Sequence, residues 1–270
     1  MGTGDGGRET RDEALSPEFV ADLYRRFAPD LARVREEQRR RYAVRGDVKA
    51  ERYRAYRALS SVLGALGVPA HFKRRFKPQV DDIEAEVTYL LVRDARPAVV
   101  VEIAPDRGWS TTWLLAGLRD NGMGHLYSYD IFDHATKVVP RDLSDGRWTF
   151  TLGDVTRPPD HLPPAIDFLF LDAAHSAPFA QWYLSALMPR LRRGTPVAIH
   201  DIFLPAERLD LFGESVAVRE WLQQRGMPYF TASPAAARDA FDLINTVKRE
   251  LGLAAPIMAS QANPMLFFRM

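Results

Sequence analysis

From about residue 80 to the end of the chain, two patterns of apolar positions alternate. Nearly continuous apolar runs, typical of buried strands, occur in AVVVEIA, HLYSYDI, WTFTLGD, IDFLFLDAA and PVAIHDI. Stretches with helical spacing lie between several of them, such as STTWLLAGLRDN and APFAQWYLSALMPRLRRG. In the latter, Phe179, Tyr183, Leu187 and Leu191 are four residues apart, and Gly194 is expected to end the helix. This alternation predicts an α/β fold whose parallel sheet is covered by helices on both faces.

Further elements are predicted on both sides of this alternating region. The segment QVDDIEAEVTYLLVRDARP reads as a helix, with Val80, Ile83, Val87 and Leu91 on one face and an end before Pro97. Beyond Asp201 the pattern predicts an amphipathic stretch ESVAVREWLQQRG, an apolar run PYFTAS, a helix over 235–251 and a terminal apolar run NPMLFFRM.

The N-terminal part of the chain has a different character. Residues 1–14 are polar and glycine-rich and are predicted to be a disordered tail, whereas 15–78 form an arginine-rich helical extension. Ser16, followed by proline and glutamate, is a helix-start signal. An apolar face is formed by Tyr53, Tyr56, Leu59, Leu63 and Leu66. We interpret the arginines as the solvated side of this helix, with a patch for phosphate or acidic substrates as the alternative, and the extension as a lid or subunit contact. The remaining residues, 79–270, are expected to form the main domain.

Composition narrows the class of protein. The chain has 270 residues, 46% of them hydrophobic, and its net charge of +1 comes from 36 basic and 35 acidic residues. This balance argues against nucleic-acid binding, which needs a basic surface. The absence of cysteine excludes disulfides, thiolate metal sites and a cysteine nucleophile. No apolar stretch approaches the ~20 residues of a membrane span, and the N-terminus lacks a signal-peptide core, so we expect a cytoplasmic protein without membrane contact.

Acidic residues follow the predicted strands in order. Glu102, Asp130, Asp154, Asp172 and Asp201 each lie at or near a carboxyl end. In a parallel sheet these ends share one edge, outside which ligands bind. Asp favours turns and often ends a strand, but five successive cases exceed that explanation. Carboxylates gathered at one edge repel one another, so a compensating group such as ribose hydroxyls, an amine or a cation is expected.

The first strand–turn–helix unit, VVVEIAPDRGWSTTWLLAGL, indicates which ligand this is. A dinucleotide loop needs several glycines so that the backbone can approach a pyrophosphate, but this turn has only Gly108. Ala104 stands where glycine would be wanted, and Asp106 adds a negative charge. A cationic, phosphate-free adenosine compound suits such a turn, and S-adenosylmethionine is one. Its carboxylate would lie against the free N–H groups at Ser110 and Thr111.

The motifs VVEIAPDRGWST, YSYDIF, LGDV, FLFLDAAHS and VAIHDIF together resemble the class I S-adenosylmethionine-dependent methyltransferases. They are most similar to the branch of small-molecule and sugar O-methyltransferases of antibiotic pathways. The resemblance covers about residues 80–204 and the segment NPMLFF. It implies a Rossmann-like, doubly wound, mostly parallel seven-stranded sheet with an antiparallel C-terminal strand, here preceded by the N-terminal helical extension.

The same resemblance assigns cofactor residues. Glu102, Ala104 and Gly108 would form the first cofactor turn, Asp130 would bind the ribose hydroxyls, and Asp154 would bind the adenine amino group. The chain departs from the family at Ala104, where glycine is usual and a methyl group would crowd the cofactor.

The resemblance also suggests the chemistry. Asp172, grouped with the cofactor residues too, and Asp201 would hold a divalent cation such as Mg²⁺ that lowers the pKa of an acceptor hydroxyl. His175 or His200 would accept its proton as general base. Adjacent residues of a strand face opposite ways, so we expect Asp201 rather than His200 at the metal. His175 has a second interpretation, because it precedes Ser176 and could cap the following helix.

We therefore expect an O-methyltransferase acting on a hydroxyl of a sugar or polyketide-type small molecule, working as a homo-oligomer. One alternative is a protein of the same fold that binds S-adenosylmethionine but catalyses a cyclisation without methyl transfer. A second is a nicotinamide-dependent oxidoreductase, against which the missing glycines and the additional Asp154 count.

Overall fold

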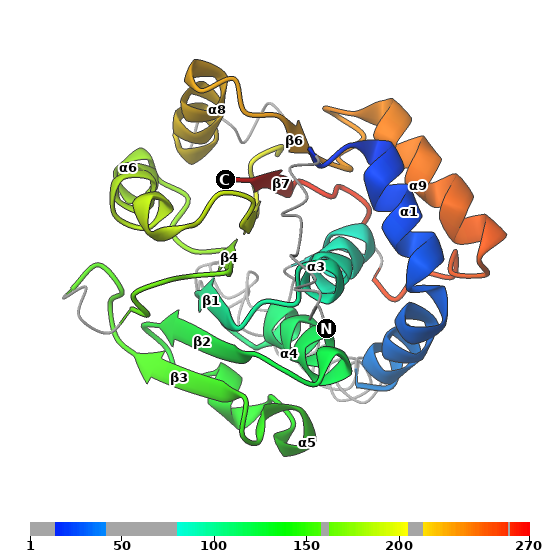
Figure 1. The fold of residues 1–270 in the computed structure, drawn as a ribbon, viewed down its shortest axis with the longest axis horizontal. Helices are drawn as coiled ribbons and strands as arrows, with labels where there is room; N and C mark the ends of the chain where they lie inside the picture. Colours follow the sequence, from blue (N-terminus) through cyan, green and yellow to red (C-terminus); the bar gives the residue numbers. More distant parts are fainter. Residues whose placement is uncertain (1–13, 42–79, 158–161, 205–212, 259) are drawn as a thin grey trace, which may run out of the picture.

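The computed structural model describes residues 14–41, 80–157, 162–204, 213–258 and 260–270. Seven strands of this part form one sheet in the order β3-β2-β1-β4-β5-β7-β6 (Figure 1). Their bounds are β1 Val99–Ile103, β2 His125–Asp130, β3 Trp148–Leu152, β4 Phe168–Leu171, β5 Pro196–Ile199, β6 Tyr229–Phe230 and β7 Leu266–Arg269. Strands β1 to β5 pair in parallel, whereas β7 is antiparallel to both β5 and β6. The predicted fold class is thus confirmed.

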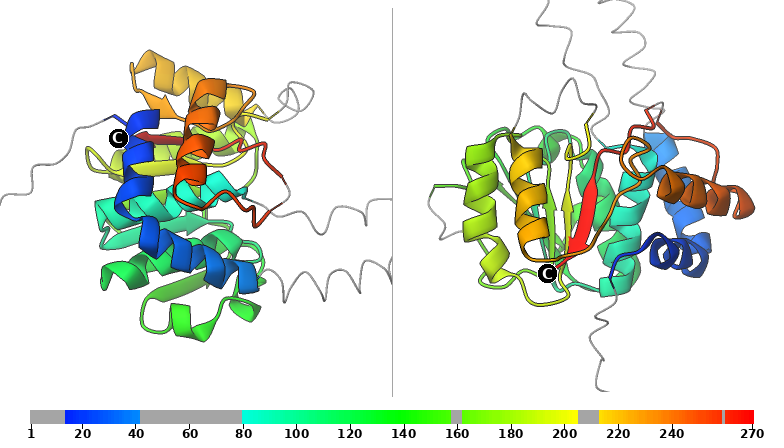
Figure 2. Two further views of the ribbon diagram at one scale, coloured as in Figure 1. Left: turned by 90° about the vertical axis from the view of Figure 1, so that its right-hand side faces the viewer. Right: turned by 90° about the horizontal axis from the view of Figure 1, so that it is seen from above.

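Helices cover both faces of the sheet, and one face has a second helical layer. The helices are α1 Pro17–Arg26, α3 Asp82–Ala95, α4 Trp109–Asn121, α5 Arg141–Ser144, α6 Ala177–Ala186, α8 Glu214–Gln224, α9 Arg238–Glu250 and the helical segment 28–41. Helices α6 and α8 lie on one face and α3 and α4 on the other, with α1, segment 28–41 and α9 outside them (Figures 1 and 2). Two apolar cores result, one on each face. No helix in the described ranges is long and apolar enough to cross a membrane.

The N-terminal extension is described only in its first part. The Ser16 hydroxyl accepts a hydrogen bond from the Phe19 backbone N–H at 3.1 Å, which confirms the predicted helix start. The expected tail over 1–14 lies outside the described residues except for its last residue. The predicted apolar face of tyrosines and leucines between 53 and 66 also lies outside them.

Helix α6 is shorter than the sequence pattern predicts. It ends at Ala186 rather than continuing toward Gly194, and a 3₁₀ turn over Met188–Arg190 follows. Pro189 explains the early end, because its ring disfavours a helical conformation in the preceding residue and it lacks an N–H.

Helix α3 is buried on every side rather than on one face. Every residue from Asp82 to Val92 is buried. The acids of this region bind backbone N–H groups of the segment that leads into β7. Asp82 accepts hydrogen bonds from Ile257 (2.7 Å) and Met258 (3.0 Å), and Glu84 accepts one from Met265 (2.6 Å). These carboxylates fix the approach of the C-terminal segment to the sheet.

Replacing Asp82 by Ala should therefore destabilise the fold. Two buried N–H groups would lose their acceptor, which costs about 2–4 kcal/mol in the free energy of unfolding. Urea denaturation followed by circular dichroism measures this loss in the free energy of unfolding. Asp142→Ala is the control, because the Asp142 side chain is 73% exposed. Equal effects of both substitutions would contradict the role given to Asp82.

Candidate functional site

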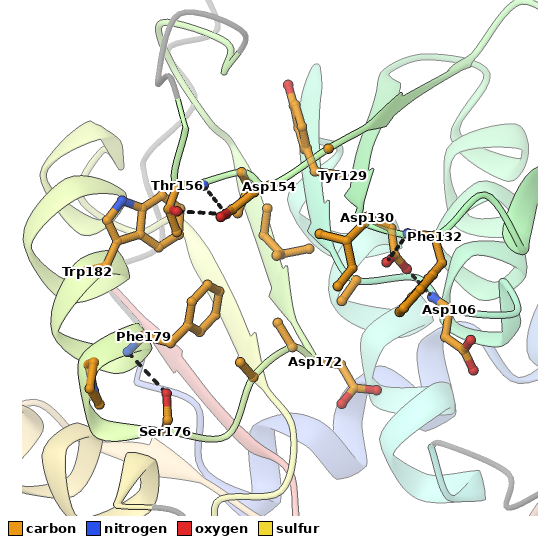
Figure 3. A pocket seen from close by; sticks show the side chains of 18 residues that line it. Asp106, Tyr129, Asp130, Phe132, Asp154, Thr156, Asp172, Ser176, Phe179 and Trp182 are labelled. Atoms are coloured by element: carbon orange, nitrogen blue, oxygen red, sulfur yellow. Dashed lines mark hydrogen bonds between the residues drawn. The ribbon is translucent and has the colours of Figure 1, made fainter. Parts of the chain in front are cut away.

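A cavity of about 820 Å³ opens at the carboxyl ends of β1, β2 and β4 (Figure 3). Of the residues that the sequence assigns to a cofactor, Ala104, Asp130, Asp154 and Asp172 line it. The strand order places these strand ends side by side, which is why residues far apart in the sequence meet there.

Asp130 is held at the cavity wall by two backbone N–H groups. Its Oδ2 accepts a hydrogen bond from the Asp106 N–H at 2.9 Å, and its Oδ1 accepts one from the Phe132 N–H at 3.0 Å (Figure 3). Burial raises the pKa of Asp130 above its ordinary value, against the effect of these bonds. Each oxygen retains a second lone pair, so the carboxylate can still accept bonds from a ligand's hydroxyl groups.

Asp154 follows the neighbouring edge strand and is more exposed. Its Oδ1 accepts hydrogen bonds from the Thr156 hydroxyl (2.7 Å) and backbone N–H (2.9 Å), which lower its pKa (Figure 3). The loop that carries Asp154 is joined to β2 by a backbone bond from Gly153 to Asp130 at 2.8 Å. Asp154 is therefore ionised at the cavity wall.

Glu102 lies beneath the first turn rather than in the cavity lining. It is fully buried and accepts hydrogen bonds from the hydroxyls of Ser110 (2.6 Å), Thr111 (2.9 Å) and Ser128 (2.6 Å). Burial raises the pKa of Glu102 to about 7. Ser110, Thr111 and Gly108 are likewise absent from the lining, so these four predicted cofactor residues shape the turn from below.

The turn itself contains three residues with left-handed backbone conformations, Ala104, Asp106 and Gly108. Gly108 has φ 73°, and a Cβ added there would lie 2.5 Å from the Val139 side chain, so only glycine fits. Ala104, which lines the cavity, has φ 62°. An L-residue in this conformation costs roughly 1–2 kcal/mol. The left-handed backbone at this position explains why glycine is usual here in the methyltransferases that the sequence resembles. Ala104 adopts the same conformation with strain.

Apolar side chains complete the cavity, and the sequence analysis did not assign them to it. Ile131 and Phe132 are 61% and 56% exposed at its rim, and Phe179 and Trp182 stack at 5.3 Å on the other side. Trp182, on helix α6, thus lines the cavity. The sequence did contain one signal for the cavity. Ile131 and Phe132 directly follow Asp130 in a loop, where solvent exposure disfavours apolar side chains.

Beside the cavity, two histidines meet several carboxylates. His200 Nδ1 lies 3.1 Å from Asp172 and 3.4 Å from Asp201, and its Nε2 lies 3.4 Å from Glu84. The His200 and Asp201 side chains thus approach each other, contrary to the prediction that they face opposite ways. The strand ends at Ile199 and Asp201 adopts φ 59°, so the alternation of a strand no longer holds there.

The second histidine, His175, is the more accessible. Its Nδ1 lies 2.8 Å from Glu214, its Nε2 lies 3.4 Å from Asp201, and its side chain is 20% exposed. The buried Glu214 also accepts a bond from the Tyr183 hydroxyl at 3.0 Å. The Ser176 side chain caps helix α6, so the capping interpretation of His175 is wrong.

The protonation of the two imidazoles differs in degree. Burial alone would lower the pKa of His200, but the charges of Asp172 and Glu84 raise it well above the ordinary value. Burial also opposes protonation of His175, but its hydrogen bond to Glu214 outweighs this and raises the pKa of His175. His175 is the less buried of the two imidazoles.

Asp172 and Asp201, which the resemblance assigns to a divalent cation, lie beside imidazoles. Among the described residues, no group of three or more His, Asp or Glu side chains is arranged to hold a metal ion.

Comparisons with known proteins support the fold and the class of enzyme. Residues 101–202 match the family model described as "Methyltransferase domain". A comparison with curated protein sequences gave no match. The matched segment extends from β1 to the residues after β5 and includes the cavity's strand ends and both histidines.

The solved structures that are similar to this chain share little of its sequence. An O-methyltransferase from Bacillus cereus, in complex with SAH, is 18% identical with a TM-score of 0.47 over 66% of this chain and 84% of that chain. The Podospora anserina methyltransferase PaMTH1 is 11% identical, with a TM-score of 0.47 over 69% and 77%. The O-methyltransferase TomG from Streptomyces achromogenes is 18% identical, with a TM-score of 0.45 over 54% and 71%.

The buried carboxylate of Glu102 should make stability depend on pH. Its folded-state pKa of about 7 exceeds the ordinary value of 4.5, so the folded protein holds the proton more tightly than the unfolded chain. The free energy of unfolding should then fall by on the order of 3 kcal/mol as pH rises from about 4.5 to 7. Glu102→Gln should flatten this dependence in urea titrations, whereas Glu36→Gln, at an exposed position, should leave it unchanged. A wild-type curve that does not fall in this window would contradict the role of burial.

Proposed function

We propose that the chain is an S-adenosylmethionine-dependent O-methyltransferase that acts on a hydroxyl of a sugar or polyketide-type small molecule. The observation that carries this proposal is the carboxylate-lined cavity at the strand ends of the methyltransferase domain, with no glycine-rich loop to receive a diphosphate. A cationic adenosine compound complements such a cavity, whereas a dinucleotide would meet Asp106 and Asp130 with its phosphates.

The lining suggests how the cofactor would be held. Asp130, fixed by two backbone N–H groups, would accept hydrogen bonds from the ribose hydroxyls. Asp154 would accept one from the adenine amino group, and the exposed ring of Phe132 offers an apolar contact for the base. Asp172 would place a negative charge near the sulfonium centre.

The neighbouring cluster supplies a base for the acceptor. Bound S-adenosylmethionine supplies a methyl group on a sulfonium, from which the carbon–sulfur bond breaks as the carbon–oxygen bond forms. His175 Nε2 accepts the hydroxyl proton, and Glu214 orients the ring through Nδ1. The raised pKa of His200 keeps it protonated between Asp172 and Glu84, so these carboxylates remain in place during the reaction.

Calorimetry with S-adenosylmethionine and, separately, with NAD tests the cofactor directly. Binding of the former alone supports the proposal, and binding of NAD alone overturns it in favour of an oxidoreductase. Incubation with methyl-labelled cofactor and a panel of hydroxylated acceptors then tests transfer. Tight binding with product formation but no loss of label would instead indicate a cyclase of this fold.

Asp130→Ala should weaken S-adenosylmethionine binding tenfold or more, because the ribose loses its charged acceptor. Asp130→Asn, which retains one acceptor oxygen, should have a smaller effect. Calorimetry measures both, with Asp133→Ala as the control on the same loop, since the Asp133 side chain pairs with Lys137. Unchanged affinity of a folded Asp130→Ala protein would remove this residue from the cofactor site.

His175→Ala should lower kcat by 10²–10⁴-fold while leaving the Kd for S-adenosylmethionine unchanged, because it removes proton acceptance and no cofactor contact. His125→Ala, which alters a histidine bonded to Thr149 on the sheet, is the matched control. Steady-state kinetics and calorimetry give the two values. A loss of cofactor affinity equal to the loss in kcat would assign His175 to binding.

A further inference from the structure

A second cavity, of about 640 Å³, lies at the amino edge of the sheet, away from the carboxyl edge with its cofactor cavity. It is bordered by the residues just before β1, β4 and β5 and by the end of the antiparallel β7. Its volume falls in the range of small-molecule sites, roughly 300–1,000 Å³. Nothing in the proposed methyl transfer uses it.

Arginines dominate the lining of this amino-edge cavity. The six are Arg26, Arg93, Arg96, Arg192, Arg193 and Arg269, against two acids, Asp94 and Asp167. The chain as a whole has a net charge of only +1, so this concentration is local. The arginines come from four separate parts of the chain: the end of α1, the end of α3, the loop before β5 and the end of β7. The fold therefore gathers them.

Several of these guanidinium groups are held in position by the protein. Arg269 donates to the Gly194 carbonyl at 3.1 Å and to Asp94 at 3.2 Å. Arg26 also pairs with Asp94, and Arg93 is bound to Asp30 at 2.8 Å. A guanidinium has five N–H donors, so the bonds that Arg93 makes to Asp30, Asn121 and Tyr89 leave others available to a ligand. Fixed donors lose less conformational freedom on binding than mobile ones.

The positive charge at the cavity is only partly neutralised. Helices α1 and α3 end here, and their terminal carbonyls favour the basic residues of their last turns, Arg26 and Arg93. The helix ends do not account for Arg192, which lies in the loop before β5. Its side chain is 75% exposed, and its guanidinium comes no closer than 4.0 Å to the Asp167 carboxylate. Arg96 is exposed too and bonds to a backbone carbonyl at 3.0 Å rather than to an acid.

An aromatic ring lies among the guanidinium groups. Phe27 lines the cavity, with the guanidinium carbons of Arg26 and Arg93 at 5.2 and 4.9 Å from its ring centre. These cation–π contacts hold the two arginines near the ring. The cavity therefore combines a cationic wall with an apolar contact.

We propose that this amino-edge cavity binds a ligand carrying a diphosphate or triphosphate group. Arginine pairs with phosphate oxygens through two parallel hydrogen bonds, and several arginines facing one space suit an anion with more than one charge. Such a group could come from inorganic pyrophosphate or from a nucleotide, whose base would also contact Phe27. A single phosphate would leave most of the guanidinium groups unengaged.

Calorimetry with the full chain saturated with S-adenosylmethionine, which keeps the adenosine part of a probe out of the cofactor cavity, tests this with pyrophosphate, ADP, adenosine and inorganic phosphate as separate probes. Pyrophosphate and ADP should bind, adenosine should not, and phosphate should bind at least tenfold more weakly than pyrophosphate. Tighter binding of ADP than of pyrophosphate would identify the nucleotide as the source, and equal binding would identify the diphosphate alone. Binding of neither anion overturns the proposal.

A double substitution, Arg96→Gln with Arg192→Gln, should weaken pyrophosphate binding at least tenfold. Both side chains are exposed, so the fold should persist, and unchanged S-adenosylmethionine binding at the opposite edge would verify it. The matched control is Arg225→Gln with Arg238→Gln, which removes the same charge from α9 and from the end of α8. Equal weakening in both double variants would show general attraction of anions to the surface and overturn the site.

Discussion

The cavity depends on a carboxylate that it does not contain. Glu102 is the next-to-last residue of β1. Its buried carboxylate accepts hydrogen bonds from hydroxyl groups of α4 and β2. An ionisable group enclosed in this way destabilises the fold unless its oxygens are bonded, so the three hydroxyls and the carboxylate require one another. These hydrogen bonds fix the position of the turn between β1 and α4 relative to the sheet. The backbone bond from Ala104 to the Tyr129 carbonyl at 2.7 Å then sets where Asp130 stands relative to that turn.

A second buried acid joins the segment before β7 to His200. Glu84, at the start of α3, accepts a bond from the Met265 N–H just before β7 and lies 3.4 Å from His200. The same carboxylate therefore helps to seat the antiparallel strand and holds a histidine beside Asp172. This arrangement explains why α3 is buried all round despite its acids, because each acid has a partner inside the protein.

The pattern of apolar residues predicted the sheet because its strands are nearly continuous apolar runs, and FLFL in β4 is the plainest case. The acids at strand ends could be located for the same reason: once the strands are known to be parallel, their ends must share an edge. Which way an acid turns was not predictable, since Glu102 and Asp130 occupy similar sequence contexts and differ in the hydroxyls and N–H groups around them.

Residues that reach the site only through tertiary packing could not be identified from local sequence patterns. Glu214 reaches His175 from a helix 39 residues further along the chain, and Trp182 faces the cavity only because α6 packs at that angle. The arginines of the amino-edge cavity come from four segments, none of which has a pattern distinct from a solvated surface. The early end of α6, by contrast, could have been predicted from Pro189, because the effect of proline on a helix is local.

Ala104 has a consequence for how the turn behaves before a ligand arrives. A glycine in its place would explore many backbone conformations, including ones that tilt the turn into or out of the cavity. The methyl group disfavours the left-handed conformation that Ala104 adopts, so the surrounding contacts, such as the bond from its N–H to the Tyr129 carbonyl, must hold the turn in this shape. The cost of that strain is met when the chain folds, before any ligand reaches the cavity.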